Sequence, residues 1–207
     1  MSYRIEPLQI DDLAASAIIA EAFAEDPLMR WVFDAESPGY EERLGGYARV
    51  GHAWHIGQGM PAVCARSSNE MLGVLYAMQP TVQISEASLA SFAELLRAAS
   101  GDASTNRFFA YHETMDQAAP DLAVHVLALI GVVPSMQRRG VGSALVRWCQ
   151  AESAADSASV GVGLDTAGEA NLAFYESLGF RTVVTERIGP VEEAFMVWDK
   201  PVGGGET

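Results

Sequence analysis

Apolar residues follow two different patterns along this chain, and together the patterns predict a mixture of strands and helices. The run over 122–133 is the most apolar part of the sequence and is bounded by Pro120 and Pro134. Such a run predicts a strand that is covered on both faces. After a polar loop, apolar residues return at the spacing of an amphipathic helix, at Val141, Ala144, Leu145, Trp148 and Cys149.

The same two patterns predict the other elements, with proline, glycine and capping residues as boundaries. In chain order we expect a strand at 3–8, helices at 13–24 and 40–54, strands at 62–65 and 72–78 joined by a turn at 67–69, helices at 84–99 and 107–117, the strand at 122–133, a helix from 141, a strand at 160–166, a helix at 169–178 and a hairpin of strands at 182–188 and 194–198. The sequence shows no internal repeat and no linker. The fold class is therefore α/β, as one domain over 1–200 with a helical insertion at about 84–120 and a flexible tail at 201–207.

Composition narrows the class of protein. Of 207 residues, 49% are apolar, which is typical of a globular core and excludes disorder. The net charge is −14, so nucleic acid and anionic membranes, which both need a basic surface, are poor candidate partners. No apolar run approaches the ~20 residues of a membrane helix, and the first residues do not form a secretory signal. Cys64 and Cys149 lie far apart, which favours neither a disulfide framework nor a zinc site. We therefore expect a soluble, cytoplasmic protein.

A glycine-containing loop, Q-R-R-G-V-G-S over 137–143, lies between the apolar run and the amphipathic helix. The first turn of a helix leaves backbone N–H groups free, and the helix dipole places partial positive charge there. Gly140 and Gly142 allow the backbone to approach a ligand closely, and Arg138 and Arg139 add charge. The loop can therefore hold a diphosphate, although a plain turn between strand and helix explains the glycines as well.

A longer pattern surrounds this loop. It reads I-G-V-x-P-x-x-Q-x-x-G-x-G over 130–142 and is followed by N-x-x-F-Y-x-x-x-G-F over 171–180. These two blocks, together with the order of the expected elements, resemble the GNAT superfamily of N-acetyltransferases. The resemblance implies a mixed, strongly twisted central sheet flanked by helices, with a splayed pair of central strands. It also implies acetyl-CoA as the cosubstrate.

The resemblance assigns cofactor contacts residue by residue. In the superfamily the pantetheine arm of acetyl-CoA lies between the splayed strands, which here implies contacts with the backbone of Ile130, Gly131 and Val132. The pyrophosphate is implied to bind the backbone N–H groups of Arg138, Arg139, Gly140, Val141, Gly142 and Ser143. Asn171 matches a variant of the cofactor-binding motif, because the commoner asparagine position is Gly168 in this chain.

The resemblance also implies direct acyl transfer with Tyr175 as the general acid. A phenol with a pKa of about 10 can give a proton to the departing thiolate. A backbone N–H near Val132 would stabilise the charge that builds on the carbonyl oxygen. The alternative for Tyr175 is a core aromatic residue beside Phe174.

The general base is the least defined part of the site. Members of the GNAT superfamily often use a Glu or His on the long strand as the base. The comparable positions of this chain, Val126 and Ala128, carry no base. His125 is a possible base, but it has the opposite parity along the strand and is equally a hydrogen-bonded core histidine. The other candidates are Glu21, Glu25, Asp26 and Glu113, each of which a solvated helix surface also explains.

The acceptor side offers few signals. Four aromatic residues either line the acceptor cleft or belong to the core, namely Trp31, Phe33, Trp54 and Phe92. His52 and His55 share a helix face but have no third ligand, so we expect no metal.

The leading hypothesis is an N-acetyltransferase that acts on a primary amine of a small molecule. A non-catalytic acyl-CoA sensor, and an acyltransferase or decarboxylase that uses another acyl-CoA, are the alternatives. We expect a small-molecule amine as partner, no nucleic acid or membrane, and a monomer or homodimer.

Overall fold

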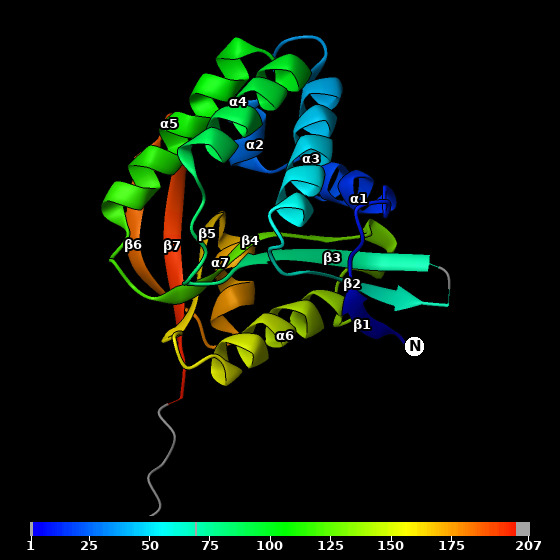
Figure 1. Cartoon of the computed structure of the whole chain (residues 1–207), viewed down its shortest axis with the longest axis vertical. Coiled ribbons are helices and arrows are strands. Elements are labelled where there is room, and N and C mark those ends of the chain that lie inside the picture. The colour runs from blue at the N-terminus through cyan, green and yellow to red at the C-terminus, as the bar shows by residue number, and fades with distance from the viewer. Residues whose placement is uncertain (1, 69, 202–207) are drawn as a thin grey trace, which may run out of the picture.

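One mixed sheet organises the chain. The computed structural model describes residues 2–68 and 70–201, and within them seven strands lie in the order β1-β2-β3-β4-β5-β7-β6 (Figure 1). The strands are β1 (Arg4–Pro7), β2 (Ala62–Ser67), β3 (Glu70–Met78), β4 (Val124–Val132), β5 (Gly161–Ala167), β6 (Arg181–Ile188) and β7 (Val191–Asp199). The pair β4–β5 is parallel, and the other neighbouring pairs of these strands are antiparallel. The sheet twists strongly from β1 to β6.

Helices cover both faces of the sheet (Figure 1). On one face lie α1 (Ala14–Ala22), α2 (Pro27–Val32), α3 (Tyr40–Gly57), α4 (Glu86–Ser100) and α5 (Asp102–Ala118). On the other face lie α6 (Val141–Ala155) and α7 (Glu169–Glu176), with the short 3-10 turn η1 (Pro134–Met136) ahead of α6. This arrangement confirms the expected α/β class with a sheet flanked by helices.

The two central parallel strands separate, as the resemblance implied. Pairing between β4 and β5 starts at Val124 and Gly161 and ends at Val126 and Gly163, although both strands continue. Just beyond that point β4 carries an additional residue, because Leu127 pairs with Ala77 of β3 and Leu129 pairs with Tyr76. The residue between them, Ala128, is a β-bulge, which bends a strand and increases its twist. The bulge therefore lies where the gap between the strands opens.

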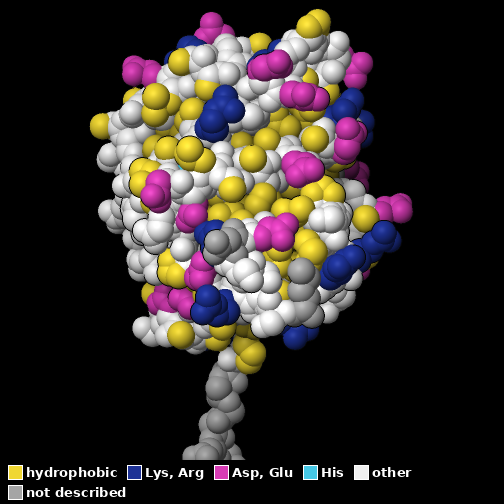
Figure 2. All heavy atoms as spheres, turned by 90° about the vertical axis from the view of Figure 1, so that its right-hand side faces the viewer, with side chains coloured by type: hydrophobic (Ala, Val, Ile, Leu, Met, Phe, Trp, Pro, Cys, Tyr) yellow, Lys and Arg dark blue, Asp and Glu magenta, His cyan; other side chains and the backbone are white. Residues whose placement is uncertain are grey.

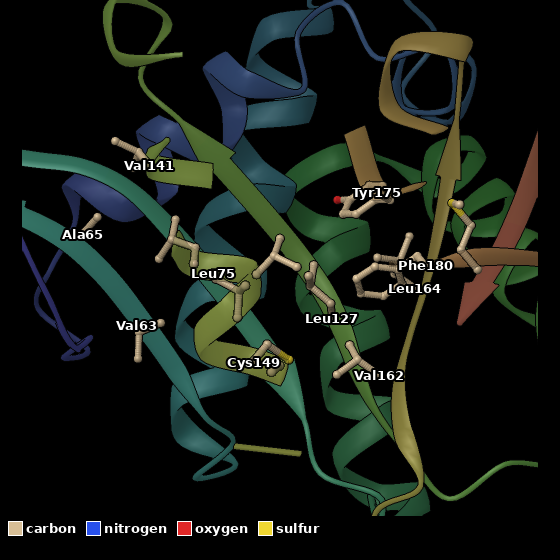
Figure 3. Packing of buried hydrophobic residues seen from close by; sticks show 14 of the residues in the cluster. Val63, Ala65, Leu75, Leu127, Val141, Cys149, Val162, Leu164, Tyr175 and Phe180 are labelled. Carbon is tan, nitrogen blue, oxygen red and sulfur yellow. The ribbon is translucent and has the colours of Figure 1, made fainter. Parts of the chain in front are cut away.

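The core consists of hydrophobic clusters on both sides of the sheet. Under α6 and α7, Leu75, Leu127 and Leu164 pack with Cys149 and Phe180 (Figure 3). These side chains are at most 5% exposed. They anchor α6, so the position of its first turn is fixed by the strands below it.

Aromatic residues dominate the core on the other face. The ring centroids of Phe33 and Tyr47 lie 5.1 Å apart, and those of Tyr47 and Phe108 lie 5.4 Å apart. Phe92 of α4 packs at 5.8 Å from Phe108. The range 84–120 therefore holds the helices α4 and α5, which join this aromatic core.

Several boundaries differ from those expected. The helix expected at 107–117 begins earlier, at Asp102, because Gly101, with φ +83°, ends α4 and α5 starts directly after it. The second strand of the C-terminal hairpin starts at Val191 because its turn is short. The strand expected to be covered on both faces is exposed at Ala128, since the gap beside β4 leaves that residue open.

Parts of two sequence-based predictions fall outside the described residues. The residues concerned are Asn69, in the turn expected at 67–69, and residues 202–207, in the expected tail. In the described part of the chain, no helix combines the length and the apolar character needed to cross a membrane. On the face shown in Figure 2, basic and acidic side chains are interspersed among apolar ones.

Candidate active site

A cavity of about 620 Å³ opens where β4 and β5 separate. Its walls come from the end of β4, the first turn of α6, α7, β5 and β7, and from α5 and the segment between α1 and α2. Residues from all parts of the sequence therefore meet at the gap in the sheet.

The glycine loop forms one part of the wall. Gly140 has φ +85°, a conformation that favours glycine, and its carbonyl oxygen accepts the first helical hydrogen bond of α6 from the N–H of Ala144 at 3.0 Å. The N–H groups of Val141, Gly142 and Ser143 precede that bond and lie in the first turn. This helix end can therefore bind an anionic group through backbone donors and the helix dipole.

The cavity contacts most of the residues assigned to the cofactor. Its lining includes Ile130, Val132, Arg138, Gly140, Gly142, Ser143 and Asn171. Gly131, Arg139 and Val141 do not contribute to that lining. Gly131 instead allows α1 to approach β4, because a Cβ there would lie 3.2 Å from the carbonyl oxygen of Ile18.

Tyr175 lines the same cavity from α7. Its ring packs against Phe174 at 5.0 Å and Phe180 at 5.6 Å, and its hydroxyl points toward β4 (Figure 3). Burial raises the pKa of Tyr175, and the charge of Asp26 raises it further. The hydroxyl therefore stays protonated at neutral pH and can act as a proton donor.

His125 lies elsewhere. It is 2% exposed, its Nδ1 is 3.1 Å from Oγ of Ser159, and its Nε2 is 3.8 Å from Asp156. It belongs to the section of β4 that is still paired with β5, and the cavity lining does not include it. A general base at this site would therefore be one of the titratable side chains that line the cavity.

Of the other base candidates, Asp26 alone lines the cavity. Its Oδ1 accepts a hydrogen bond from the N–H of Met29 at 2.9 Å and caps α2. Burial raises the pKa of Asp26. Glu21, Glu25 and Glu113 are exposed side chains that do not contribute to the lining.

Two acidic residues in the cavity wall were missed by the sequence analysis. Asp165 on β5 and Glu193 on β7 both line the cavity. Burial raises the pKa of Asp165 to about 6 and that of Glu193 to about 8, and Asp26 and Asp165 add to the effect on Glu193. For Asp165 the available signal was a carboxylate inside an otherwise apolar strand, since acidic residues are rarely buried without a partner. Glu193 lay outside the strand expected at 194–198 and gave no such signal.

The remaining residues that the sequence analysis singled out lie outside the cavity lining. Trp31, Phe33, Trp54 and Phe92 belong to the aromatic core or pack against it, outside the cavity lining. The Nδ1 of His52 lies 2.8 Å from the hydroxyl of Tyr76. Within residues 2–68 and 70–201, no group of three or more His, Cys, Asp or Glu side chains is arranged to hold a metal ion.

Comparison with known proteins agrees with this geometry. Residues 104–182 match the family model described as acetyltransferase (GNAT) domain. No curated protein matches the sequence. Residues 104–182 therefore resemble a GNAT acetyltransferase domain, and the chain as a whole has the GNAT fold.

Solved structures show the same fold over nearly the whole chain. A structure titled histone acetyltransferase HPA2 and related acetyltransferase, from Corynebacterium glutamicum, has a TM-score of 0.72 at 20% identity and covers 99% of both chains. A PaiA N-acetyltransferase from Thermoplasma acidophilum, solved in complex with coenzyme A, has a TM-score of 0.57 at 14% identity and covers 96% of this chain and 99% of its own. An IAA acetyltransferase from Bacillus cereus has a TM-score of 0.52 at 12% identity and covers 96% of this chain and 99% of its own.

Proposed function

We propose that this protein transfers an acetyl group from acetyl-CoA to a primary amine of a small molecule, with Tyr175 as the general acid. The observation that supports the proposal is that the hydroxyl-bearing Tyr175 and the first turn of α6 line one cavity at the gap between β4 and β5. An anion-binding helix end can hold the diphosphate of CoA, and a proton donor can protonate the departing thiolate.

The cavity wall fits a CoA thioester. Among the described residues, the edge of β4 that faces β5 has no strand partner beyond Val126, so the backbone of Ile130, Gly131 and Val132 can pair with the extended pantetheine arm. The carbonyl oxygen of Val132 accepts a hydrogen bond from the side chain of Gln137 at 3.3 Å, which the arm would replace. The backbone N–H groups over 138–143 would hold the pyrophosphate at the first turn of α6. Asn171 donates a hydrogen bond to the carbonyl oxygen of Ala167 at 3.1 Å and orients the start of α7.

Tyr175 then acts on the leaving group. The thiolate that departs from the carbonyl carbon needs a proton, and a buried phenol that stays protonated can supply it. A backbone N–H near Val132 would stabilise the negative charge on the carbonyl oxygen.

The test is Tyr175→Phe, assayed by release of free thiol from acetyl-CoA in the presence of an amine panel. We expect kcat to fall by about 10²- to 10⁴-fold, the usual contribution of a general acid. The Kd for acetyl-CoA, measured by calorimetry, should not change, because the ring and its packing remain. Tyr47→Phe is the matched control, since Tyr47 is 5% exposed in the aromatic core and does not line the cavity.

The same experiment separates the alternatives. A sensor of acyl-CoA would bind acetyl-CoA in both proteins and acetylate no amine. An acyltransferase or decarboxylase for another acyl group would turn over a different thioester in the wild type. Wild-type turnover that Tyr175→Phe leaves unchanged would contradict the role of Tyr175.

A further inference from the structure

Asp165 and Glu193 share one face of the sheet. Glu193 of β7 is the register partner of Ala167 on β5, and Asp165 lies two residues before Ala167 on that strand. Side chains two residues apart on a strand point to the same face, so the two carboxyl groups are diagonal neighbours. The hydroxyl of Tyr111, on α5, donates to Oδ2 of Asp165 at 3.2 Å, which places the pair on the face covered by α5.

Both carboxyl groups have an oxygen without a partner. Glu193 is 2% exposed, and its buried Oε2 has no hydrogen bond to any residue that the structure describes. Oδ1 of Asp165 is in the same condition. A buried carboxyl without hydrogen bonds is costly for a folded protein, and proteins rarely keep one without a function.

The surroundings of the pair are acidic. Asp26 lies close enough to raise the pKa of Glu193, Asp116 of α5 acts in the same way on Asp165, and Glu186 of β6 is the register partner of Glu193. In the described part of the chain, no Lys, Arg or His side chain forms an ion pair with Asp26, Asp165 or Glu193. Among the described residues these three carboxyl groups therefore lack an ion-pair partner, although Arg138 also lines the cavity.

We infer that Glu193, supported by Asp165, binds the ammonium group of the acceptor and takes its proton, and that the acceptor is a small amine without a carboxylate. This inference rests on the proposed acetyl transfer and assigns the base that the sequence left open. Glu193 lines the same cavity as Tyr175 and comes from the face of the sheet opposite α7. Amine and thioester therefore meet in the gap between β4 and β5.

The proton transfers balance with these residues. The positive charge of the bound ammonium group favours the ionised form of Glu193. One proton of the ammonium group then passes to the Glu193 carboxylate, and the lone pair of the neutral amine forms the C–N bond at the thioester carbon. The C–S bond breaks with its electron pair on sulfur, which takes the hydroxyl proton of Tyr175. The nitrogen loses its second proton to the tyrosinate as the amide forms, and Glu193 returns its proton to water when the products leave.

The acid cluster also selects the substrate. A carboxylate on the acceptor would lie beside Asp26, Asp165 and Glu193, and like charges in a cavity repel strongly. Phe23, Leu28 and Met29 contribute apolar wall that accepts a hydrocarbon chain. Butylamine and 4-aminobutyrate have the same chain length and differ in this respect, so they form a matched pair of substrates.

The first experiment compares Glu193→Gln and Asp165→Asn with Glu192→Gln. Glu192 is the adjacent, exposed residue on β7 and serves as the control. We expect Glu193→Gln to lower kcat/KM for butylamine by about 100-fold or more, Asp165→Asn to lower it less, and Glu192→Gln to leave it unchanged. Glu193→Gln should keep the wild-type Kd for acetyl-CoA and melt no lower than the wild type, which shows that the variant folds. Unchanged kcat/KM in Glu193→Gln would overturn the inference.

The second experiment measures amine binding directly, so that it does not depend on turnover. Butylamine is titrated by calorimetry into the wild type and Glu193→Gln, each with and without CoA. Weaker binding to the variant, together with no detectable binding of 4-aminobutyrate to the wild type, supports the inference. Equal binding of butylamine to both proteins, or acetylation of 4-aminobutyrate as efficient as that of butylamine, contradicts it. Failure to bind CoA at all would refute the proposed function instead, and the titrations without CoA would still test Glu193.

Discussion

Glu193 makes the stability of the protein depend on pH, and one substitution removes that dependence. Burial, with Asp26 and Asp165, raises the pKa of Glu193 from its ordinary 4.5 to about 8. Below pH 4.5 the group is protonated in both the folded and the unfolded chain. Between these two values the folded protein keeps a proton that the unfolded chain loses, so the free energy of unfolding falls as pH rises. The loss is complete above the folded pKa.

The magnitude follows from the two pKa values. The difference between 4.5 and about 8 corresponds to about 5 kcal/mol at 1.36 kcal/mol per pH unit. Because Glu193 is 2% exposed, solvent screens little of this effect. Glutamine does not titrate, so the stability of Glu193→Gln relative to the wild type should increase by up to about 5 kcal/mol between about pH 4 and pH 9.

The assay is urea unfolding of the wild type, Glu193→Gln and Glu192→Gln across this pH range. The curve for Glu192→Gln should follow that of the wild type, since Glu192 is exposed on the same strand. The curves of Glu193→Gln and wild type should diverge as pH rises. If the difference in unfolding free energy between Glu193→Gln and the wild type changes by less than about 1 kcal/mol over this pH range, the reasoning about buried charge is refuted, because that change is smaller than a shift of one pKa unit produces.

Two further substitutions test the cofactor side of the cavity. Gly142→Asp should abolish acetyl-CoA binding in calorimetry, because it adds negative charge at the first turn of α6. Gly142→Ala should fold normally, because its Cβ would meet Phe174 at 3.5 Å and Val132 at 3.6 Å, which are ordinary contacts. Unchanged affinity in Gly142→Asp would contradict the loop assignment. Gly131→Ala should lower the free energy of unfolding by about 1–3 kcal/mol, as overpacking does, because its Cβ would lie 3.2 Å from Ile18, Ile19 and Ala22 of α1. Gly51→Ala is the control, because its Cβ would meet nothing within 4 Å. Equal thermal stability of the two variants would show that α1 can move away.

The sequence determined the order of the elements and the local parts of the site. Strands and helices follow from apolar periodicity, and the turn at Gly140 follows from the glycine that starts α6, because these signals act between neighbouring residues. Tyr175 came from the resemblance to the GNAT superfamily, whose motif has a fixed spacing within one helix and its cap, and its role as the acid stays a prediction. Each of these inferences needs only a short segment of chain.

The tertiary structure decided where the chemistry lies. The bulge at Ala128 and the end of pairing at Val126 open the cavity, and neither can be read from β4 alone because both depend on how its neighbours pair with it. The resemblance made His125 a possible base because it lies next to the comparable strand positions, but its place in the paired section of β4 takes it out of the cavity wall.

The acidic cluster shows the same limit most clearly. Asp26, Asp165 and Glu193 come from the segment before α2, from β5 and from β7, and they meet only when the sheet is assembled. Burial raises the pKa of all three, and the charges of Asp26 and Asp165 raise that of Glu193 further, which are properties of the folded chain and of no single segment. The sequence therefore indicated the fold and, through the resemblance, a candidate acid, while only the tertiary structure brought a candidate base to the same cavity.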